Sequence, residues 1–305
     1  MKIVIFGASG MLGSMVLDYL SRQDDFQVKA TVRDEALITQ IQNRYYGVEW
    51  TVIDVEQCNV KMMVDILGEA SWAINAIGLI KPYIHDDNDS EIKKAIMINA
   101  LFPQLLASAA QKTGCRVLQI ATDCVYSGGK GHYNEADAHD ALDVYGKTKS
   151  LGETFSSQMH HLRCSIIGPE LKNHVSLLDW FLGQSPGSTI NGFTNHKWNG
   201  ITTLNFARIC YGIIKHDVNL PHVHHLIPSG EVSKDQLLHC FAKEYKRNDI
   251  TIKPFEAKIV VDRTLTTVND NLNNQLWESA GYPTAPSVPA AVAELAVYKS
   301  NFQNR

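Results

Sequence analysis

Apolar runs and amphipathic stretches alternate along the first half of the chain. The apolar runs are short and rich in β-branched residues, and they fall at 3–6, 28–32, 51–53, 72–77, 116–121 and 162–167. The stretches between them carry apolar residues at helical spacing, and they span 11–22, 58–68, 92–112 and 145–159. This alternation is typical of βαβ units, so the pattern predicts an α/β fold built on a doubly wound parallel sheet.

The pattern changes after Gly168-Pro169, where Gly and Pro residues divide the chain into shorter pieces. A chain of 305 residues is long for one core, because single cores stop growing at about 250–300 residues. We therefore predict a main domain over 1–168 and a smaller C-terminal lobe over 169–305. A helical pattern at 204–215 and a strand-like run at 223–227 predict that one segment near 204–227 returns to the main domain.

A glycine-rich turn follows the first apolar run and precedes the first helical stretch. Its sequence is Gly7-Ala8-Ser9-Gly10-Met11-Leu12-Gly13, with the spacing GxxGxxG. Glycines let the chain turn tightly and let backbone N–H groups approach a pyrophosphate, while the start of the helix adds partial positive charge. No Lys follows the last glycine, which argues against a nucleotide-hydrolase P-loop. The turn predicts a Rossmann-type site for a dinucleotide.

Residues after the second and third apolar runs bear on the identity of the dinucleotide. Arg33 could pair with the 2′-phosphate of NADP, whereas its neighbour Asp34 could bond the ribose of NAD. Because Arg33 comes first after the run, we predict NADP(H) in preference to NAD(H). Asp54 either lies near the adenine or caps the helix that follows, and the sequence leaves both roles open.

Tyr145 and Lys149 stand four residues apart, which places a phenol and an ammonium on one face of a helix. A phenol with its ordinary pKa of about 10 can protonate a developing alkoxide, and a nearby cation increases its acidity. Such a pair alone is weak evidence for a catalytic site, because it arises by chance on many helices. Following a phosphate-binding turn in an alternating α/β chain, it predicts acid catalysis at a carbonyl group.

These motifs together resemble an extended short-chain dehydrogenase/reductase. They are GASGMLG at 7–13, Asp54, NAIG at 75–78, Asn99, ATDCVYSG at 121–128 and YGKTK at 145–149. Within that superfamily, the runs 122–128 and 145–153 are most similar to the dTDP-4-dehydrorhamnose reductases. The resemblance covers the whole first domain, so it implies a Rossmann-type domain followed by a substrate-binding lobe.

The resemblance also implies roles for individual residues. Thr122 would hydrogen-bond the substrate carbonyl, Tyr145 would donate the proton, and Lys149 would hydrogen-bond the cofactor ribose, while the nicotinamide supplies hydride. Asn99 would organise a water chain to Lys149. The predicted cofactor-binding residues are Gly7, Ser9, Gly10, Met11, Leu12, Gly13, Arg33, Asp54, Val55, Ala76, Gly78, Asn99, Tyr145 and Lys149.

Three further residues are predicted to contact the substrate: Asp123, Trp198 and Arg263. Trp198 could stack on a base, with packing as the alternative. Arg263 could clamp a phosphate, with a surface salt bridge as the alternative. Cys124 stands where sugar-nucleotide dehydratases carry a Glu, which argues against dehydration. Ile166 stands where the reductases usually carry an aromatic residue, which leaves the sugar open.

Composition excludes several classes of protein. The 28 basic and 32 acidic side chains give a net charge of −4 with no basic block, so nucleic acid is not an expected partner. No apolar run reaches the roughly 18 residues of a membrane span. Met1 and Lys2 lead directly into the first apolar run, so we do not expect a secretory signal. Six cysteines without a CxxC pair predict reduced thiols and no metal site, in a cytoplasmic protein.

The function predicted from these features is NAD(P)H-dependent reduction of a keto group, at C4, on a nucleoside-diphosphate-linked sugar. A nucleotide-sugar epimerase with the same Tyr/Lys pair and a non-catalytic regulatory subunit of the same fold stay as alternatives. The intact set of Thr122, Tyr145 and Lys149 favours an enzyme. A nucleoside-diphosphate sugar is the expected partner, and a homodimer stays open.

Overall fold

A parallel sheet forms the centre of the computed structural model, which describes residues 1–301. Seven strands of the described chain pair in the order β11-β6-β5-β4-β1-β2-β3, and every pair is parallel. The predicted α/β fold with a doubly wound Rossmann-type sheet is therefore confirmed. The strands are β1 (Lys2–Phe6), β2 (Gln27–Val32), β3 (Glu49–Val52), β4 (Trp72–Asn75), β5 (Arg116–Ala121), β6 (Met159–Arg163) and β11 (Val223–His225).

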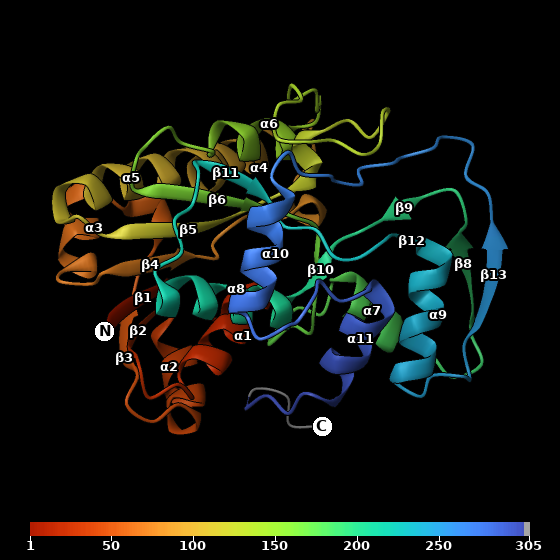
Figure 1. Cartoon of the computed structure of the whole chain (residues 1–305), viewed down its shortest axis with the longest axis horizontal. Coiled ribbons are helices and arrows are strands. Elements are labelled where there is room, and N and C mark those ends of the chain that lie inside the picture. The colour runs from red at the N-terminus through yellow and green to blue at the C-terminus, as the bar shows by residue number, and fades with distance from the viewer. Residues whose placement is uncertain (302–305) are drawn as a thin grey trace.

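Helices cover both faces of this sheet because its central strands are apolar on both sides. Along β1, Ile3 and Ile5 pack into one apolar cluster, whereas Val4 and Phe6 pack into another. The first cluster includes α1 (Met11–Leu20) and α8 (Thr203–His216), and the second includes α3 (Val60–Leu67) and α5 (Phe102–Thr113). Figure 1 shows these two pairs of helices on opposite sides of the sheet.

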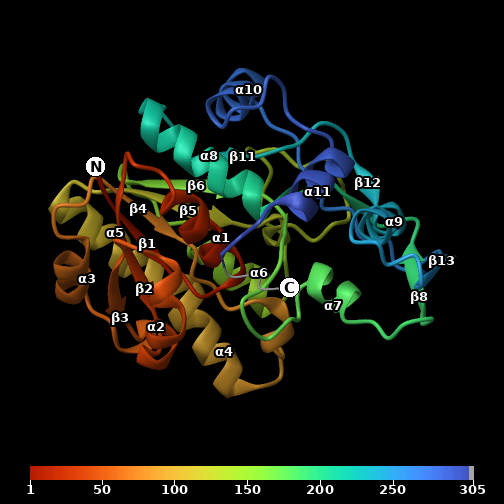
Figure 2. The ribbon, with the colours of Figure 1, turned by 90° about the horizontal axis from the view of Figure 1, so that it is seen from below.

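The C-terminal half of the chain builds a smaller layer beside the carboxyl ends of the strands, at the right of Figure 1. There α9 (Lys234–Glu244) packs on the parallel pair β8 (Thr189–Phe193) and β13 (Thr251–Phe255). Figure 2 shows α10 (Asp270–Ser279) beside α8, and α11 (Val288–Val297) beside α9. The remaining elements of this half are α7 (Leu177–Leu182), β7 (Ile166–Ile167), β9 (Lys197–Trp198), β10 (Ile201–Thr202) and β12 (Val232–Ser233).

The smaller layer shares its core with the main sheet. The cluster that contains Ile3 and Leu17 continues through Phe206 of α8 to Phe241 of α9 and Ile252 of β13. The return of the chain to the sheet follows the same route, since α8 packs on α1 and leads to β11, which pairs with β6. The division at residue 168 stays a prediction.

Three predicted elements differ from the structure. The helix predicted over 145–159 is α6 (Val144–Leu151), and β6 begins at Met159. The run at 162–167 is divided between β6 and β7, and β7 pairs with β10 outside the main sheet. The stretch at 92–112 is helical but not uniform, because a π-helical turn η4 (Ile96–Leu101) joins α4 (Asp89–Ala95) to α5.

No helix within residues 1–301 is both long and apolar enough to cross a membrane.

Candidate active site

The glycine turn lies between β1 and α1 at the carboxyl end of the sheet. Gly7 has φ +82°, and a Cβ there would lie 2.7 Å from the Ile77 side chain. A Cβ on Gly13 would overlap the Gly7 carbonyl, so the third glycine lets α1 pack directly on the turn. Gly10 is the N-cap of α1 and supplies no side-chain cap, which leaves the first N–H groups of the helix available to an anion.

A cavity of about 650 Å³ opens beside this turn. Its walls come from the ends of β1 to β4, where a dinucleotide is expected in an open α/β sheet. The predicted cofactor residues that line it are Gly7, Ser9, Gly10, Arg33, Val55, Ala76 and Gly78. Its size and glycine turn fit a pyridine nucleotide.

The two acidic residues considered at the cofactor site both cap helices. The Asp34 carboxylate accepts a hydrogen bond from the Ala36 N–H at 2.8 Å, at the start of α2 (Glu35–Ile41). The Asp54 carboxylate accepts from the Glu56 N–H at 3.2 Å, at the start of η2 (Val55–Gln57). The capping role left open for Asp54 is therefore confirmed, while Arg33 faces the cavity.

A second cavity of about 480 Å³ holds the three predicted catalytic residues, Thr122, Tyr145 and Lys149. Thr122 follows β5, and the other two lie on α6, so the sheet end and the helix bring them together. Met11 and Leu12 line the same cavity. Gly10 and Gly78 line both cavities, which makes one continuous cleft from the glycine turn to Tyr145.

Burial changes the ionisation of the Tyr/Lys pair in opposite directions. Burial raises the pKa of the Tyr145 phenol far above its ordinary value, and a hydrogen bond with Thr122 acts against this. Burial lowers the pKa of the Lys149 ammonium to about 8, although the nearby Glu153 carboxylate raises it. Tyr145 therefore holds its proton at neutral pH, as a proton donor must.

Asn99 lies in the π-helical turn η4, next to the Lys149 side chain. Its amide bonds both backbone groups of Leu79, accepting from the N–H at 2.8 Å and donating to the carbonyl at 3.0 Å. A Cβ on Gly78 would lie 3.6 Å from Asn99 Oδ1 and 3.8 Å from Lys149 Nζ. The Lys149 ammonium itself donates to the Ile120 carbonyl at 3.2 Å. Asn99 thus fixes the backbone at Leu79, which lines both cavities.

Asp123 lines the second cavity and is only 8% exposed. Burial raises its pKa, and the positive charges of Arg263 and Lys234 act against this. Its carboxylate accepts a hydrogen bond from the Thr122 hydroxyl at 3.2 Å. Burial also raises the pKa of the neighbouring Cys124 thiol to about 12, so that thiol is a poor acid/base group.

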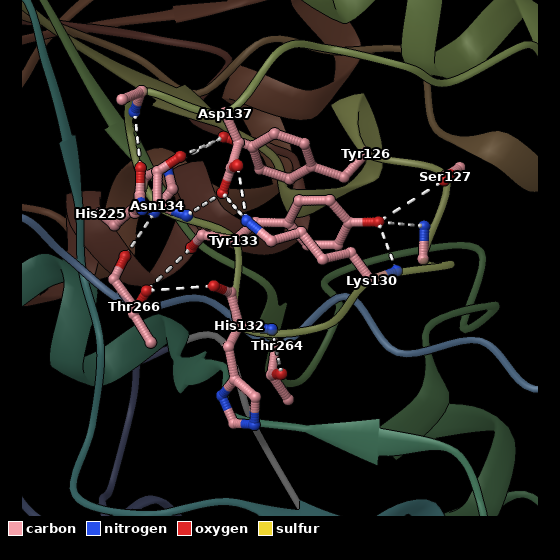
Figure 3. Close-up of polar contacts among 12 residues, drawn as sticks. Tyr126, Ser127, Lys130, His132, Tyr133, Asn134, Asp137, His225, Thr264 and Thr266 are labelled. Atoms are coloured by element: carbon pink, nitrogen blue, oxygen red, sulfur yellow. Dashed lines mark hydrogen bonds and ion pairs between the residues drawn. The ribbon is translucent and has the colours of Figure 1, made fainter.

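Arg263 is held against the segment that follows β5 and does not line either cavity described above. Its Nε donates to the Tyr126 carbonyl at 2.8 Å. The Tyr126 ring stacks on the Tyr133 ring (Figure 3), and their centroids are 4.2 Å apart. The backbone N–H of Tyr133 donates to the Thr264 carbonyl at 2.9 Å, and the backbone carbonyl of Tyr133 accepts from the Thr266 N–H at 2.7 Å. Arg263 is therefore held by the backbone of Tyr126, and its predicted contact with the substrate stays a prediction.

Trp198 is 4% exposed and lies in the apolar core. Its indole N–H donates to the Ser165 hydroxyl at 2.8 Å, and a Cβ on Gly200 would overlap its ring. The base-stacking role is corrected to packing, because the ring faces of a stacking residue must be open to the ligand.

Sequence reasoning missed charged residues that no local motif marks. Lys94 lines the first cavity from α4, and Glu56 lies between Lys94 and Arg33. Lys234, at the start of α9, sits near Asp123, and burial lowers the pKa of its ammonium to about 8. The segment 170–177 lines the second cavity through several residues, which are Glu170, Asn173, Val175, Ser176 and Leu177.

Solved structures of related fold share this architecture. One is a dTDP-4-dehydrorhamnose reductase from Bacillus anthracis in complex with NADP, with a TM-score of 0.70 and 16% identity over 96% of this chain and 98% of that chain. Another is a UDP-glucuronic acid 4-epimerase from Bacillus cereus in complex with NAD, with a TM-score of 0.74 and 16% identity over 97% of this chain and 96% of that chain.

Sequence relatives point to one family. A dTDP-4-dehydrorhamnose reductase from Aggregatibacter actinomycetemcomitans is 30% identical over 153 residues. The match covers 50% of this chain and 45% of that relative, so it spans less than half of the relative's length. The family model described as RmlD substrate binding domain matches residues 1–168, which is more than half of the 305 residues. The chain belongs to the RmlD substrate binding domain family.

Proposed function

We propose that this protein reduces a keto group, at C4, on a sugar linked to a nucleoside diphosphate, with NADPH as the reductant. The observation that carries the proposal is the continuous cleft between the glycine turn and Tyr145. A dinucleotide held at the glycine turn reaches the second cavity through Gly10 and Gly78, and this second cavity contains the predicted proton donor.

Each catalytic residue has a task that its surroundings suit. The Thr122 hydroxyl and the Tyr145 phenol hydrogen-bond the substrate carbonyl and stabilise the developing alkoxide. Tyr145 then transfers its proton to that oxygen. Lys149 supplies a positive charge close by and bonds the cofactor ribose. The nicotinamide, when bound, supplies the hydride to the carbonyl carbon, so the ketone gains one hydride from the cofactor and one proton from Tyr145 and becomes an alcohol.

The remaining site residues divide between cofactor and sugar. We assign the pyrophosphate to the glycine turn, the adenine to the side of Val55, and the 2′-phosphate to Arg33, which gives NADP(H) preference over NAD(H). The sugar occupies the cavity lined by Asp123 and Ile166. Arg263 acts on the sugar site through the charge it places near Asp123.

The test is a panel of 4-keto sugars linked to dTDP or UDP, incubated with the protein and NADPH. We expect oxidation of one NADPH for each sugar reduced, with a product two mass units heavier. An isomeric product without net NADPH consumption would identify an epimerase. No turnover of any 4-keto sugar in the panel would overturn the proposal.

The nucleoside-diphosphate sugar is the partner that this proposal requires. We also infer a soluble cytoplasmic enzyme, and the sequence leaves a homodimer open. Cell fractionation tests the location, and a membrane-bound protein would contradict it, while sedimentation equilibrium distinguishes a monomer from a dimer.

A further inference from the structure

Glu56 lies between two cations at the edge of the cofactor cavity. Its Oε1 accepts a hydrogen bond from the Arg33 guanidinium at 2.8 Å and lies 3.6 Å from the Lys94 ammonium nitrogen. Arg33 and Lys94 both line the 650 Å³ cavity. One carboxylate oxygen therefore neutralises part of the positive charge that the two side chains present to the cavity.

Three separate elements bring these side chains together. Arg33 follows β2, Glu56 lies in η2 after β3, and Lys94 lies on α4. The backbone of Glu56 is fixed by its hydrogen bond to the Asp54 carboxylate, whereas the side chains keep some exposure, at 57% for Arg33, 31% for Glu56 and 37% for Lys94. Side chains at a partly solvated edge can exchange partners when a stronger anion arrives.

We propose that Arg33 and Lys94 together form a site for a phosphate monoester, and that Glu56 is the carboxylate which this phosphate displaces. The inference rests on the proposed function, since it takes the cavity to be the dinucleotide site. Glu56 is then a specificity-determining residue that limits the preference for NADP over NAD.

The charges explain the direction of this effect. A phosphate monoester carries a charge of about −1.5 to −2 at pH 7, so it attracts both cations and repels a carboxylate held between them. The 2′-hydroxyl of NAD is neutral and can bind while the ion pair stays intact. Removing the charge of Glu56 should therefore strengthen the binding of NADPH selectively.

The experiment compares Glu56→Gln with the wild-type protein in equilibrium binding of NADPH and NADH. We expect the Kd of NADPH to fall about tenfold, with the Kd of NADH changed by less than about twofold. Lys94→Met should raise the Kd of NADPH about tenfold and leave that of NADH nearly unchanged. The gain in Glu56→Gln should shrink as ionic strength rises, because salt screens exposed charges.

Glu69→Gln is the matched control, because Glu69 forms an exposed ion pair with Lys2 at 3.0 Å, away from the residues that line the cavity. Its two dissociation constants should match those of the wild type. Equal changes for both cofactors in Glu56→Gln, or stronger binding of NADH alone, would overturn the proposal.

Binding is measured without a sugar, so the outcomes separate this inference from the proposed reaction. Selectivity that shifts as expected in a protein inactive on every keto sugar supports the phosphate site and overturns the reaction. Unchanged selectivity in a protein that reduces a keto sugar overturns the phosphate site alone. A wild-type protein that binds neither dinucleotide overturns both.

Discussion

The side chains of Thr122 and Tyr145 meet because a strand end and a helix face converge on one cavity. In the proposed reaction the phenol is the proton donor, because it lines this cavity and forms a hydrogen bond with the Thr122 side chain. The hydroxyl group of Tyr145 alone performs this proton donation, and the ring is not needed for it.

Tyr145→Phe should lower turnover by about 10²–10⁴, because it removes the proton donor and keeps the ring. NADPH affinity should stay within about twofold, since the ring still fills the same space. Single-turnover measurement of NADPH oxidation checks the chemical step directly. Near-normal turnover in this variant would remove Tyr145 from the mechanism.

The lowered pKa of Lys149 predicts how the reaction depends on pH. Burial lowers the pKa of its ammonium from the ordinary 10.5 to about 8, so the cation is lost as pH rises through about 8. The Tyr145 pKa is raised, so the phenol stays protonated over the same range. We expect kcat/KM for NADPH to fall above pH 8, since this parameter reports groups of the free enzyme.

Lys147→Ala provides the control for this profile, because Lys147 is exposed on the same helix. It should reproduce the wild-type pH dependence. A profile for the wild type that stays flat up to about pH 10, near the ordinary pKa of lysine, would show that Lys149 is not needed as a cation.

At the scale of the element, the end of α6 is set by a contact with another helix. A Cβ on Gly152 would overlap the carbonyl oxygen of Asn99 in the π-helical turn η4. The Gln119 side chain, from β5, donates to the Gly152 carbonyl at 2.9 Å. The close approach therefore positions the helix that carries Lys149 relative to Asn99 and the sheet.

Gly152→Ala should destabilise the protein by about 1–3 kcal/mol, because the added methyl group forces the two backbones apart. Urea unfolding measures this change. Gly129→Ala is the control, since its Cβ would meet no atom closer than the Ser127 hydroxyl at 3.7 Å, and its stability should stay within about 0.5 kcal/mol of the wild type. Equal unfolding midpoints for the two variants would contradict the contact.

The same helix shows where prediction from sequence succeeds and where it stops. The apolar strands and the glycine turn were predictable because buried parallel strands and phosphate-binding turns are local patterns. The end of α6 was not, because Leu151 and Phe155 continue the apolar pattern although they are 64% and 95% exposed. The helix ends at a tertiary contact that periodicity cannot reveal.

Site residues follow the same rule. Tyr145 and Lys149 form a pattern within one helix, so the sequence predicts them as a pair. Glu56 and Lys94 meet only when η2 and α4 fold together, and no motif marks either residue. Trp198 is placed by its contact with Ser165, which lies 33 positions away in the chain.

At the scale of the whole molecule, one buried arginine connects the segment that follows α6 to the C-terminal half. Arg163 in β6 donates to both carboxylate oxygens of Glu153, at 3.1 and 2.6 Å. Its Nη1 donates to the Tyr126 hydroxyl at 2.8 Å and to His225 Nε2 at 2.5 Å. Tyr126 and His225 belong to the contact region of Figure 3, where the segment after β5 meets β11 and Thr266.

Arg163→Met should destabilise the protein by about 3–5 kcal/mol, because it leaves the buried Glu153 carboxylate without its partner. The double variant Glu153→Gln/Arg163→Met should recover part of this loss, since no buried charge stays unpaired. Lys2→Met, at an exposed ion pair, should have little measurable effect. Urea unfolding measures the stability of each variant. A double variant as unstable as Arg163→Met would show that lost packing, not the unpaired charge, causes most of the destabilisation.

The pH dependence of stability in acid tests the Arg163–Glu153 ion pair independently. Burial raises the pKa of Glu153, but the Arg163 guanidinium outweighs burial and holds that pKa below its ordinary value. A lowered folded-state pKa means that the pair stabilises the protein above the unfolded-state pKa of about 4.3 and that this stability is lost as pH falls through the folded-state value. The free energy of unfolding should therefore decrease more steeply below about pH 4.3 in the wild type than in the double variant. Parallel pH profiles for the two proteins would show that Arg163 does not lower the pKa of Glu153 in the folded state.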